Sequence, residues 1–163
     1  MNESTKNYTS EQMERELSKI GSEISFSSSG RSTTIFISSL TKNLDKTLSL
    51  LEEKLFRPAF SDADLKRVKK QFIESLNAQQ KDANSVARSR FNELLFGETP
   101  FGLKASEKTI NKIKIKHVES FYNNNYSPSV SNITVVGDIS RDELLQKLDF
   151  LNNWDKKTVD IPT

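Results

Sequence analysis

The sequence contains no cysteine and only one histidine, His117, and these two scarcities remove several classes of chemistry. Without cysteine there is no disulfide, no thiol nucleophile and no zinc site built on cysteine ligands. One histidine is too few for a histidine-rich metal site, and no serine stands in a recognisable catalytic arrangement with it. His117 is therefore interpreted as a structural or surface residue. The lack of cysteine is compatible with a location on either side of a membrane.

Long apolar runs and an excess of one charge are also missing. No stretch approaches the roughly 20 apolar residues that cross a bilayer, and the opening MNESTKNYT has no signal-peptide core. The 24 basic and 22 acidic residues leave a net charge of +2, which favours neither a nucleic-acid nor a membrane-surface partner. The basic run at residues 66–70 is interpreted as the solvated face of a helix, with nucleic-acid binding as the less favoured alternative.

What is present indicates one folded domain, because 163 residues with ten phenylalanines and regularly spaced leucines can bury a core. Apolar residues recur at helical spacing in several segments and alternate with polar residues in others. Helices are predicted over residues 10–20, 44–57, 61–76, 86–95, 106–126 and 140–150. Strands are predicted over residues 22–28, 33–40 and 130–136.

This order of elements predicts the α+β class, with a small, mostly antiparallel sheet and several helices packed on one of its faces. Three strands are few for such a sheet, so we expect that the first elements of the unit lie outside this chain. Residues 1–154 are predicted to form a single unit, and the polar residues 155–163 to begin a linker to a following unit.

No nucleotide-binding loop and no nucleophile elbow occurs in the sequence. The most conspicuous carboxylate is Glu74, within the segment QFIESL of a predicted helix. At about 100° per residue, Glu74 lies roughly 180° from Leu65, on the side opposite the apolar stripe. Ser75 and Val68 flank that stripe instead. The helical phase therefore favours a solvent-facing Glu74 and leaves no acidic side chain looking into a site.

Five segments, in this order and spacing, carry a resemblance that spans nearly the whole chain: TKNYTSEQMERELSKIGSEIS, SLTKNLDKTLSLLEEKLFRPAFSDADLKRVKKQ, LLFGETPFGLKASEKTINKI, HVESFYNNNYSPS and ITVVGDIS. On these segments the sequence resembles the insulinase/pitrilysin family of zinc metallopeptidases, the inverzincins. The resemblance implies homologous α+β units in two halves that close around a chamber. Catalytic units carry H-x-x-E-H on a helix, where the histidines hold zinc and the glutamate activates water.

The sequence departs from the catalytic pattern of this family wherever the two can be compared. The H-x-x-E-H motif would lie just upstream of Thr5. In the family register, Ser75 takes the place of the glutamate zinc ligand, and Val68 takes the place of a second, supporting glutamate. Ser25 and Phe26 replace an Asn-Ala pair that contacts the substrate backbone. Glu74, one residue out of register, is left as a disfavoured ligand.

The resemblance and the departures together predict a non-catalytic unit of a zinc peptidase. Such a unit forms a chamber wall, assists peptide binding and has no cofactor of its own, while any zinc lies in a catalytic unit of the parent protein. One alternative is the body of an active unit whose motif lies upstream. Another is a structural subunit related to the core proteins of respiratory complexes.

The expected partners are the other units of the parent protein and a peptide substrate. Nucleic acid and a membrane span are not expected. A sheet edge left open by absent flanking elements would allow copies of the chain to self-associate. Family habit favours the periplasm.

Overall fold

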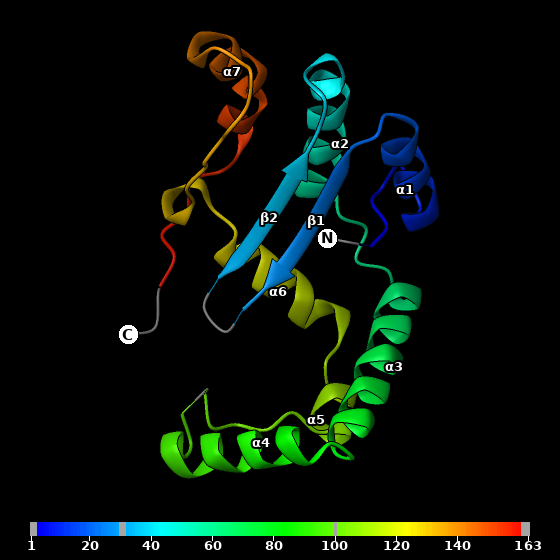
Figure 1. The fold of residues 1–163 in the computed structure, drawn as a ribbon, viewed down its shortest axis with the longest axis vertical. Helices are drawn as coiled ribbons and strands as arrows, with labels where there is room; N and C mark the ends of the chain where they lie inside the picture. The colour runs from blue at the N-terminus through cyan, green and yellow to red at the C-terminus, as the bar shows by residue number, and fades with distance from the viewer. Residues whose placement is uncertain (1–2, 30–31, 100, 161–163) are drawn as a thin grey trace.

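The computed structural model describes residues 3–29, 32–99 and 101–160, which form seven α-helices and a two-stranded antiparallel sheet (Figure 1). The predicted α+β class and the placement of helices on one face of the sheet are confirmed. Residues 161–163 of the predicted linker lie outside the described part. The α-helices are α1 (Ser10–Lys19), α2 (Leu44–Phe56), α3 (Asp62–Gln79), α4 (Ala83–Phe96), α5 (Glu107–Asn111), α6 (Ile115–Asn125) and α7 (Arg141–Lys147).

The sheet pairs β1 (Glu23–Ser28) with β2 (Thr33–Ser38) in an antiparallel hairpin. Because successive side chains of a strand point to opposite faces, the pair Ile24 and Ile37 lies on the core face. The neighbouring pair, Ser25 and Phe36, lies on the other face, where the Phe36 side chain remains 56% exposed. One face of the sheet is thus apolar and packed, and the opposite face is open.

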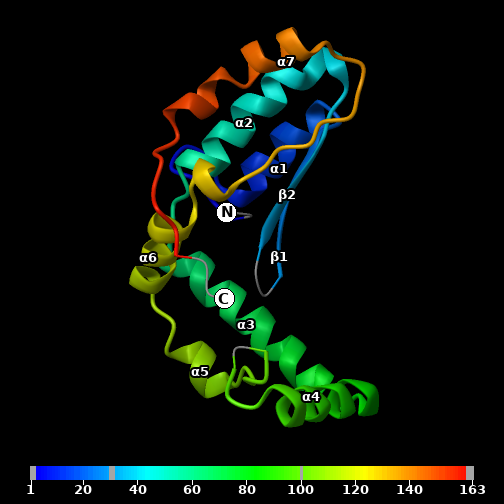
Figure 2. The same cartoon turned by 90° about the vertical axis from the view of Figure 1, so that its left-hand side faces the viewer.

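Helices α1, α2 and α6 all lie on the packed face of the sheet, as the edge-on view shows (Figure 2). The apolar side chains of α1, α2 and β1 form one buried cluster there. Leu148 and Phe150, which follow α7, pack on this cluster from the side. The buried members of the cluster are Met13, Leu17, Ile24, Leu48, Leu50 and Leu51.

Local signals in the sequence explain where α1 begins and ends. The Thr9 side chain accepts a hydrogen bond from the Gln12 backbone N–H, and the Gln12 side chain accepts one from the Thr9 backbone, so the two residues cap the helix reciprocally. After the helix, Gly21 adopts a φ of 59°, a left-handed conformation in which glycine avoids the steric cost of a Cβ. The chain then turns directly into β1.

The predicted third strand is wrong. Pro128–Val130 forms a short 3-10 helix, and residues 131–138 have no regular structure. Val135 and Val136 are 46% and 96% exposed, and no strand pairs with this segment among the described residues. β-branched residues favour extended backbone, but a strand also needs a neighbour that accepts and donates the ladder hydrogen bonds.

Helices α3 and α4 form an arm that runs away from the sheet, with α4 crossing the far end of α3 (Figure 1). No residue of either helix is buried. The apolar stripe predicted for α3 exists, but its Val68 and Phe72 are 37% and 52% exposed. On α4, Phe91 and Leu94 are 62% and 70% exposed. The described residues therefore leave most of the apolar surface of this arm uncovered.

Helix α6 returns the chain from the arm to the sheet and is tied to the end of α2. The Tyr122 hydroxyl donates to the Leu55 carbonyl at 2.5 Å, and the Tyr122 ring lies edge-on to Phe60 with the centroids 5.3 Å apart. Burial raises the pKa of the Tyr122 hydroxyl, which keeps it protonated as a donor. Near the end of the described chain, the Trp154 ring packs edge-on against Phe56 at the end of α2. The Lys157 backbone N–H donates a hydrogen bond to the Ser127 hydroxyl.

Candidate functional site

The first turn of α3 fixes the helix that carries the predicted site positions. The Ser61 hydroxyl accepts from the Asp64 backbone N–H, so Ser61 caps the helix as its sequence predicts. The Asp64 carboxylate in turn accepts hydrogen bonds from the hydroxyls of Ser61 and Ser4. These bonds lower the pKa of Asp64, that of Ser4 having the largest effect. The segment before α1 is thereby attached to the start of α3.

Val68 and Ser75 lie on the same face of α3, because seven residues turn an α-helix to within roughly 20° of its starting direction. Glu74 points elsewhere. Its side chain is 64% exposed and its Oε1 lies 3.9 Å from the Lys70 Nζ, one turn back along the helix. This is the outward position that the helical phase predicts. Such an exposed pair adds little to stability.

The side chains at the family's ligand position, Ser75, and at its supporting position, Val68, do not fit a zinc site. Zinc in proteins is held by thiolate, imidazole or carboxylate groups. Val68 offers only methyl groups, and the neutral Ser75 hydroxyl accepts from the Gln79 side chain at 3.3 Å. No group of three or more His, Cys, Asp or Glu side chains able to hold a metal ion occurs within the described ranges. The roles assigned to Val68, Ser75 and Glu74 stay predictions.

Ser25 and Phe26, the predicted peptide-contacting pair, are neighbours on β1 but face opposite ways. Phe26 is half-buried and packs on the core cluster, so its side chain points away from the open face. Ser25 is paired with the exposed Phe36 on that open face. Any contact of this pair with a peptide backbone would therefore involve the Ser25 side chain or the strand backbone. Figure 1 shows α3 leading away from β1, so the two predicted sets of residues lie on separate parts of the molecule.

His117 lies at the start of α6. Its Nδ1 accepts a hydrogen bond from the Lys114 backbone N–H at 3.1 Å, which satisfies a donor that the beginning of a helix leaves unpaired. The ring is exposed, and this contact is the structural role that its isolation in the sequence predicts.

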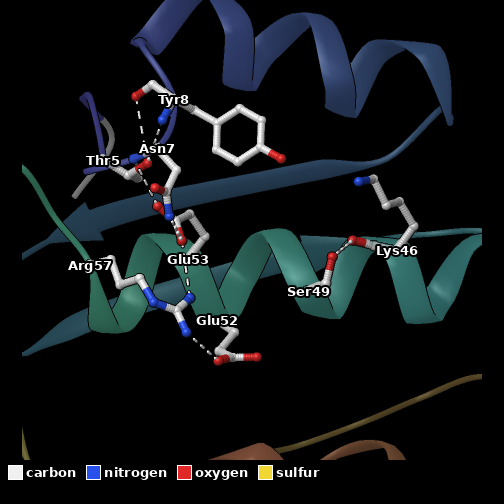
Figure 3. A network of polar contacts seen from close by, with 8 residues as sticks. All are labelled: Thr5, Asn7, Tyr8, Lys46, Ser49, Glu52, Glu53 and Arg57. Atoms are coloured by element: carbon white, nitrogen blue, oxygen red, sulfur yellow. Dashed lines mark hydrogen bonds and ion pairs between the residues drawn. The ribbon is translucent and has the colours of Figure 1, made fainter.

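A buried carboxylate on α2 was not distinguishable in the sequence. Glu52 and Glu53 stand side by side in an amphipathic helix and look like ordinary surface charges, yet Glu53 is only 4% exposed. Its two oxygens accept from the backbone N–H and the side chain of Asn7 at 3.2 and 3.0 Å, and from Arg57 at 3.0 Å (Figure 3). Asn7 and Glu53 are 46 positions apart in the sequence, so no local sequence pattern predicts their contact.

The electrostatics of Glu53 are set by two opposing effects. Burial alone would raise the pKa of its carboxyl group, but hydrogen bonds from Thr5, Asn7 and Arg57 outweigh burial and hold this pKa below the ordinary value of 4.5. The charged form is therefore favoured in the folded protein. The charged Glu53 side chain holds the segment before α1 against the end of α2. An isolated antiparallel β-bridge between Thr5 and Pro58 connects the same two segments.

Replacing Glu53 with glutamine is expected to lower the free energy of unfolding by about 1–3 kcal/mol near neutral pH, because a side-chain NH₂ would face the donors of Asn7 and Arg57. Since folding lowers the pKa of Glu53, its stabilising effect is complete above pH 4.5 and disappears as the pH falls through the folded-state pKa. Urea unfolding at several pH values measures this difference. The exposed Glu11→Gln serves as the control, and a Glu53→Gln deficit that stays constant down to strongly acidic pH would contradict the prediction.

With this geometry established, comparison with solved structures identifies the type of fold. A peptidase M16 inactive domain from Pseudomonas fluorescens superimposes on 99% of this chain with a TM-score of 0.88 and 19% identity. The periplasmic protease PqqL from Escherichia coli superimposes on the same share with a TM-score of 0.78 and 20% identity. The chain covers 41% and 19% of these two structures, respectively. The chain thus has the fold of one part of each of these larger structures.

The sequence comparisons then give the family. The insulinase family, peptidase family M16, matches residues 1–109, and the chain belongs to this family. An uncharacterized zinc protease of Rickettsia felis is 19% identical over 88% of the chain, and the non-peptidase homolog YmxG of Helicobacter pylori is 25% identical over 68% of it. The chain spans only 35% and 26% of the lengths of these relatives. Among residues 3–29, 32–99 and 101–160, none of the helices has the length and hydrophobicity of a membrane span.

Proposed function

We propose that this chain is a non-catalytic unit of a larger peptidase of the M16 type, in which it forms part of the wall of a peptide chamber. The observation that carries the proposal is that the two positions of α3 that correspond to the family's glutamates hold Val68 and Ser75, neither of which has a metal-binding side chain. Family membership and the fold shared with an inactive domain support the same function. On this proposal, zinc and the water-activating glutamate belong to another unit of the parent protein.

The exposed apolar surface of the arm supports a place inside a larger assembly. Soluble monomers seldom expose extended apolar patches, and larger ones usually mark interaction sites. The side chains of Phe72, Phe91 and Leu94 are all more than half exposed on α3 and α4. The other units of the parent protein are the expected partners of this surface. A periplasmic location is proposed from the likeness to PqqL, and cell fractionation of the source organism tests it.

Peptide binding is proposed at β1, where an extended peptide could add along the strand segment 22–28. Added strands gain main-chain hydrogen bonds from an open sheet edge, while side chains on alternate positions give selectivity. The described residues form a sheet of only two strands, which supports this mode. Ser25 offers a small polar side chain on the open face beside Phe36.

The purified chain, mixed with a fluorogenic peptide and zinc, is expected to bind the peptide without cleaving it. Fluorescence release measures cleavage, and hydrogen exchange measures binding through slower exchange of the β1 amides with no change in α4. A catalytically active M16 enzyme serves as the positive control for cleavage. Turnover that a chelator abolishes would refute the non-catalytic function, and unchanged β1 exchange would refute binding at this strand.

The alternative of an active unit requires Glu74 to face a site together with an upstream H-x-x-E-H motif. The exposure of Glu74 and its contact with Lys70 do not favour it. The alternative of a structural subunit gains some support from the likeness to a non-peptidase homolog. A search for H-x-x-E-H in the parent protein separates the two. The proposed function requires the motif in another unit of the parent protein, whereas a structural subunit does not.

A further inference from the structure

A groove with an unusual charge lies between α3 and the segment that joins α5 to α6. It holds about 1260 Å³, and its walls come from α3 between Asp62 and Glu74 and from residues 107–116. The Lys69 Nζ donates to the Asn111 carbonyl at 3.1 Å, which links the two walls. The groove is separate from the Val68 and Ser75 positions, neither of which lines it.

Positive charge dominates the lining of this groove. Five lysines and Arg67 face three carboxylates, those of Asp62, Glu74 and Glu107, a local excess of three positive charges. The whole chain has a net charge of only +2, so the excess is concentrated here. Arg67 pairs with Glu3 and Asp64, and Lys70 pairs with Glu74. Lys66, Lys114 and Lys116 are exposed, and none of them takes part in an ion pair with another described residue.

Apolar side chains lie among these lysines. Leu65 and Ile73 contribute from α3, and Ile113 and Ile115 contribute from the opposite wall. The Ile113 side chain is 41% exposed. A phosphate backbone gains nothing from such residues, whereas a polypeptide with apolar and acidic side chains gains from both the hydrophobic contacts and the charges. The composition of the groove therefore favours a protein ligand over a nucleic acid.

We propose that this groove is a docking site for an acidic, amphipathic polypeptide segment of a partner protein. Its carboxylates would pair with Lys66, Lys114 and Lys116, and its apolar side chains would cover Ile73 and Ile113. The α3 wall spans about 18 Å at 1.5 Å per residue, which matches roughly three turns of a docked helix. The site goes beyond the proposed chamber function, since it uses a different face of α3.

The probe for this proposal is a fluorescein-labelled synthetic helix with glutamates on one face and leucines on the other. Fluorescence anisotropy is expected to show saturable binding that weakens with salt. The variant K66E/K114E/K116E is expected to lose affinity by about tenfold or more, because it reverses the charges that face the ligand. The matched variant K6E/K42E/K81E makes the same change in net charge at exposed lysines outside the groove, and a loss below about twofold is expected.

Circular dichroism checks that both variants fold, and K66Q/K114Q/K116Q replaces the reversed variant if it does not. Ile113→Ser should weaken binding of the leucine-bearing probe but leave any binding of a polyglutamate peptide unchanged. The proposal would be overturned if the probe did not bind. It would also be overturned if K66E/K114E/K116E and K6E/K42E/K81E lost affinity for the probe equally. Tighter binding of a single-stranded oligonucleotide than of the peptide would also overturn it, in favour of a phosphate ligand.

Discussion

Replacing Leu50 with alanine is expected to lower the free energy of unfolding by about 3–5 kcal/mol, at the upper end of the range for buried leucines. Leu50 is 1% exposed and belongs to the cluster that joins α1, α2 and β1. Removing its side chain loses burial and leaves a cavity that this small core has little means of filling. Because domains are stable by only about 5–15 kcal/mol, the loss would remove a large share of the free energy of unfolding.

Urea unfolding followed by circular dichroism measures this effect, with Leu94→Ala as the matched control. Leu94 is 70% exposed on α4, so the same chemical change is expected to alter the free energy of unfolding by less than about 0.5 kcal/mol. If Leu50→Ala and Leu94→Ala lowered the free energy of unfolding equally, α4 would be packed as firmly as the core. That result would contradict the exposed arm on which the proposed assembly surface rests.

The triple variant F72S/F91S/L94S is expected to convert self-associating chains to monomers at micromolar concentration. These side chains are 52%, 62% and 70% exposed on α3 and α4, and water-exposed apolar surface of this kind drives association. Their removal should leave the free energy of unfolding nearly unchanged, because none of them is buried. Sedimentation velocity over a range of protein concentrations measures the change.

A second triple variant, V130S/V136S/L145S, identifies the surface responsible. It also removes three exposed apolar side chains, at 43%, 96% and 56% exposure, but from segments outside the arm. If this variant disperses the oligomers and the arm variant does not, then association runs through the unpaired segment 131–138 or its neighbours. That outcome would favour open-edge pairing as the route of self-association.

Glu53 and the apolar stripe of α3 both have environments that depend on distant parts of the chain. The spacing of Leu65, Val68 and Phe72 correctly gives a helix with an apolar side, but it does not say that this side is covered. The pair Glu52 and Glu53 looks uniform in sequence, yet one carboxylate is bonded to a residue 46 positions away. In both cases the burial of the side chain depends on which distant segment packs against it, and the spacing of apolar residues does not predict that segment.

The sequence by itself determined the features that depend on near neighbours in the chain, namely the capped helices at Thr9 and Ser61, the hairpin and the outward phase of Glu74. Through the resemblance of five segments, it also indicated the family. Tertiary structure alone decided that residues 131–138 pair with no described strand, that Glu53 is buried, and that the lysines of α3 meet those near α6 in one groove. Caps and phases follow from hydrogen bonds and rotations inside one element. Burial, local charge and the pairing of a strand with a distant segment arise only when segments far apart in the chain are brought together, and their free energies depend on that juxtaposition.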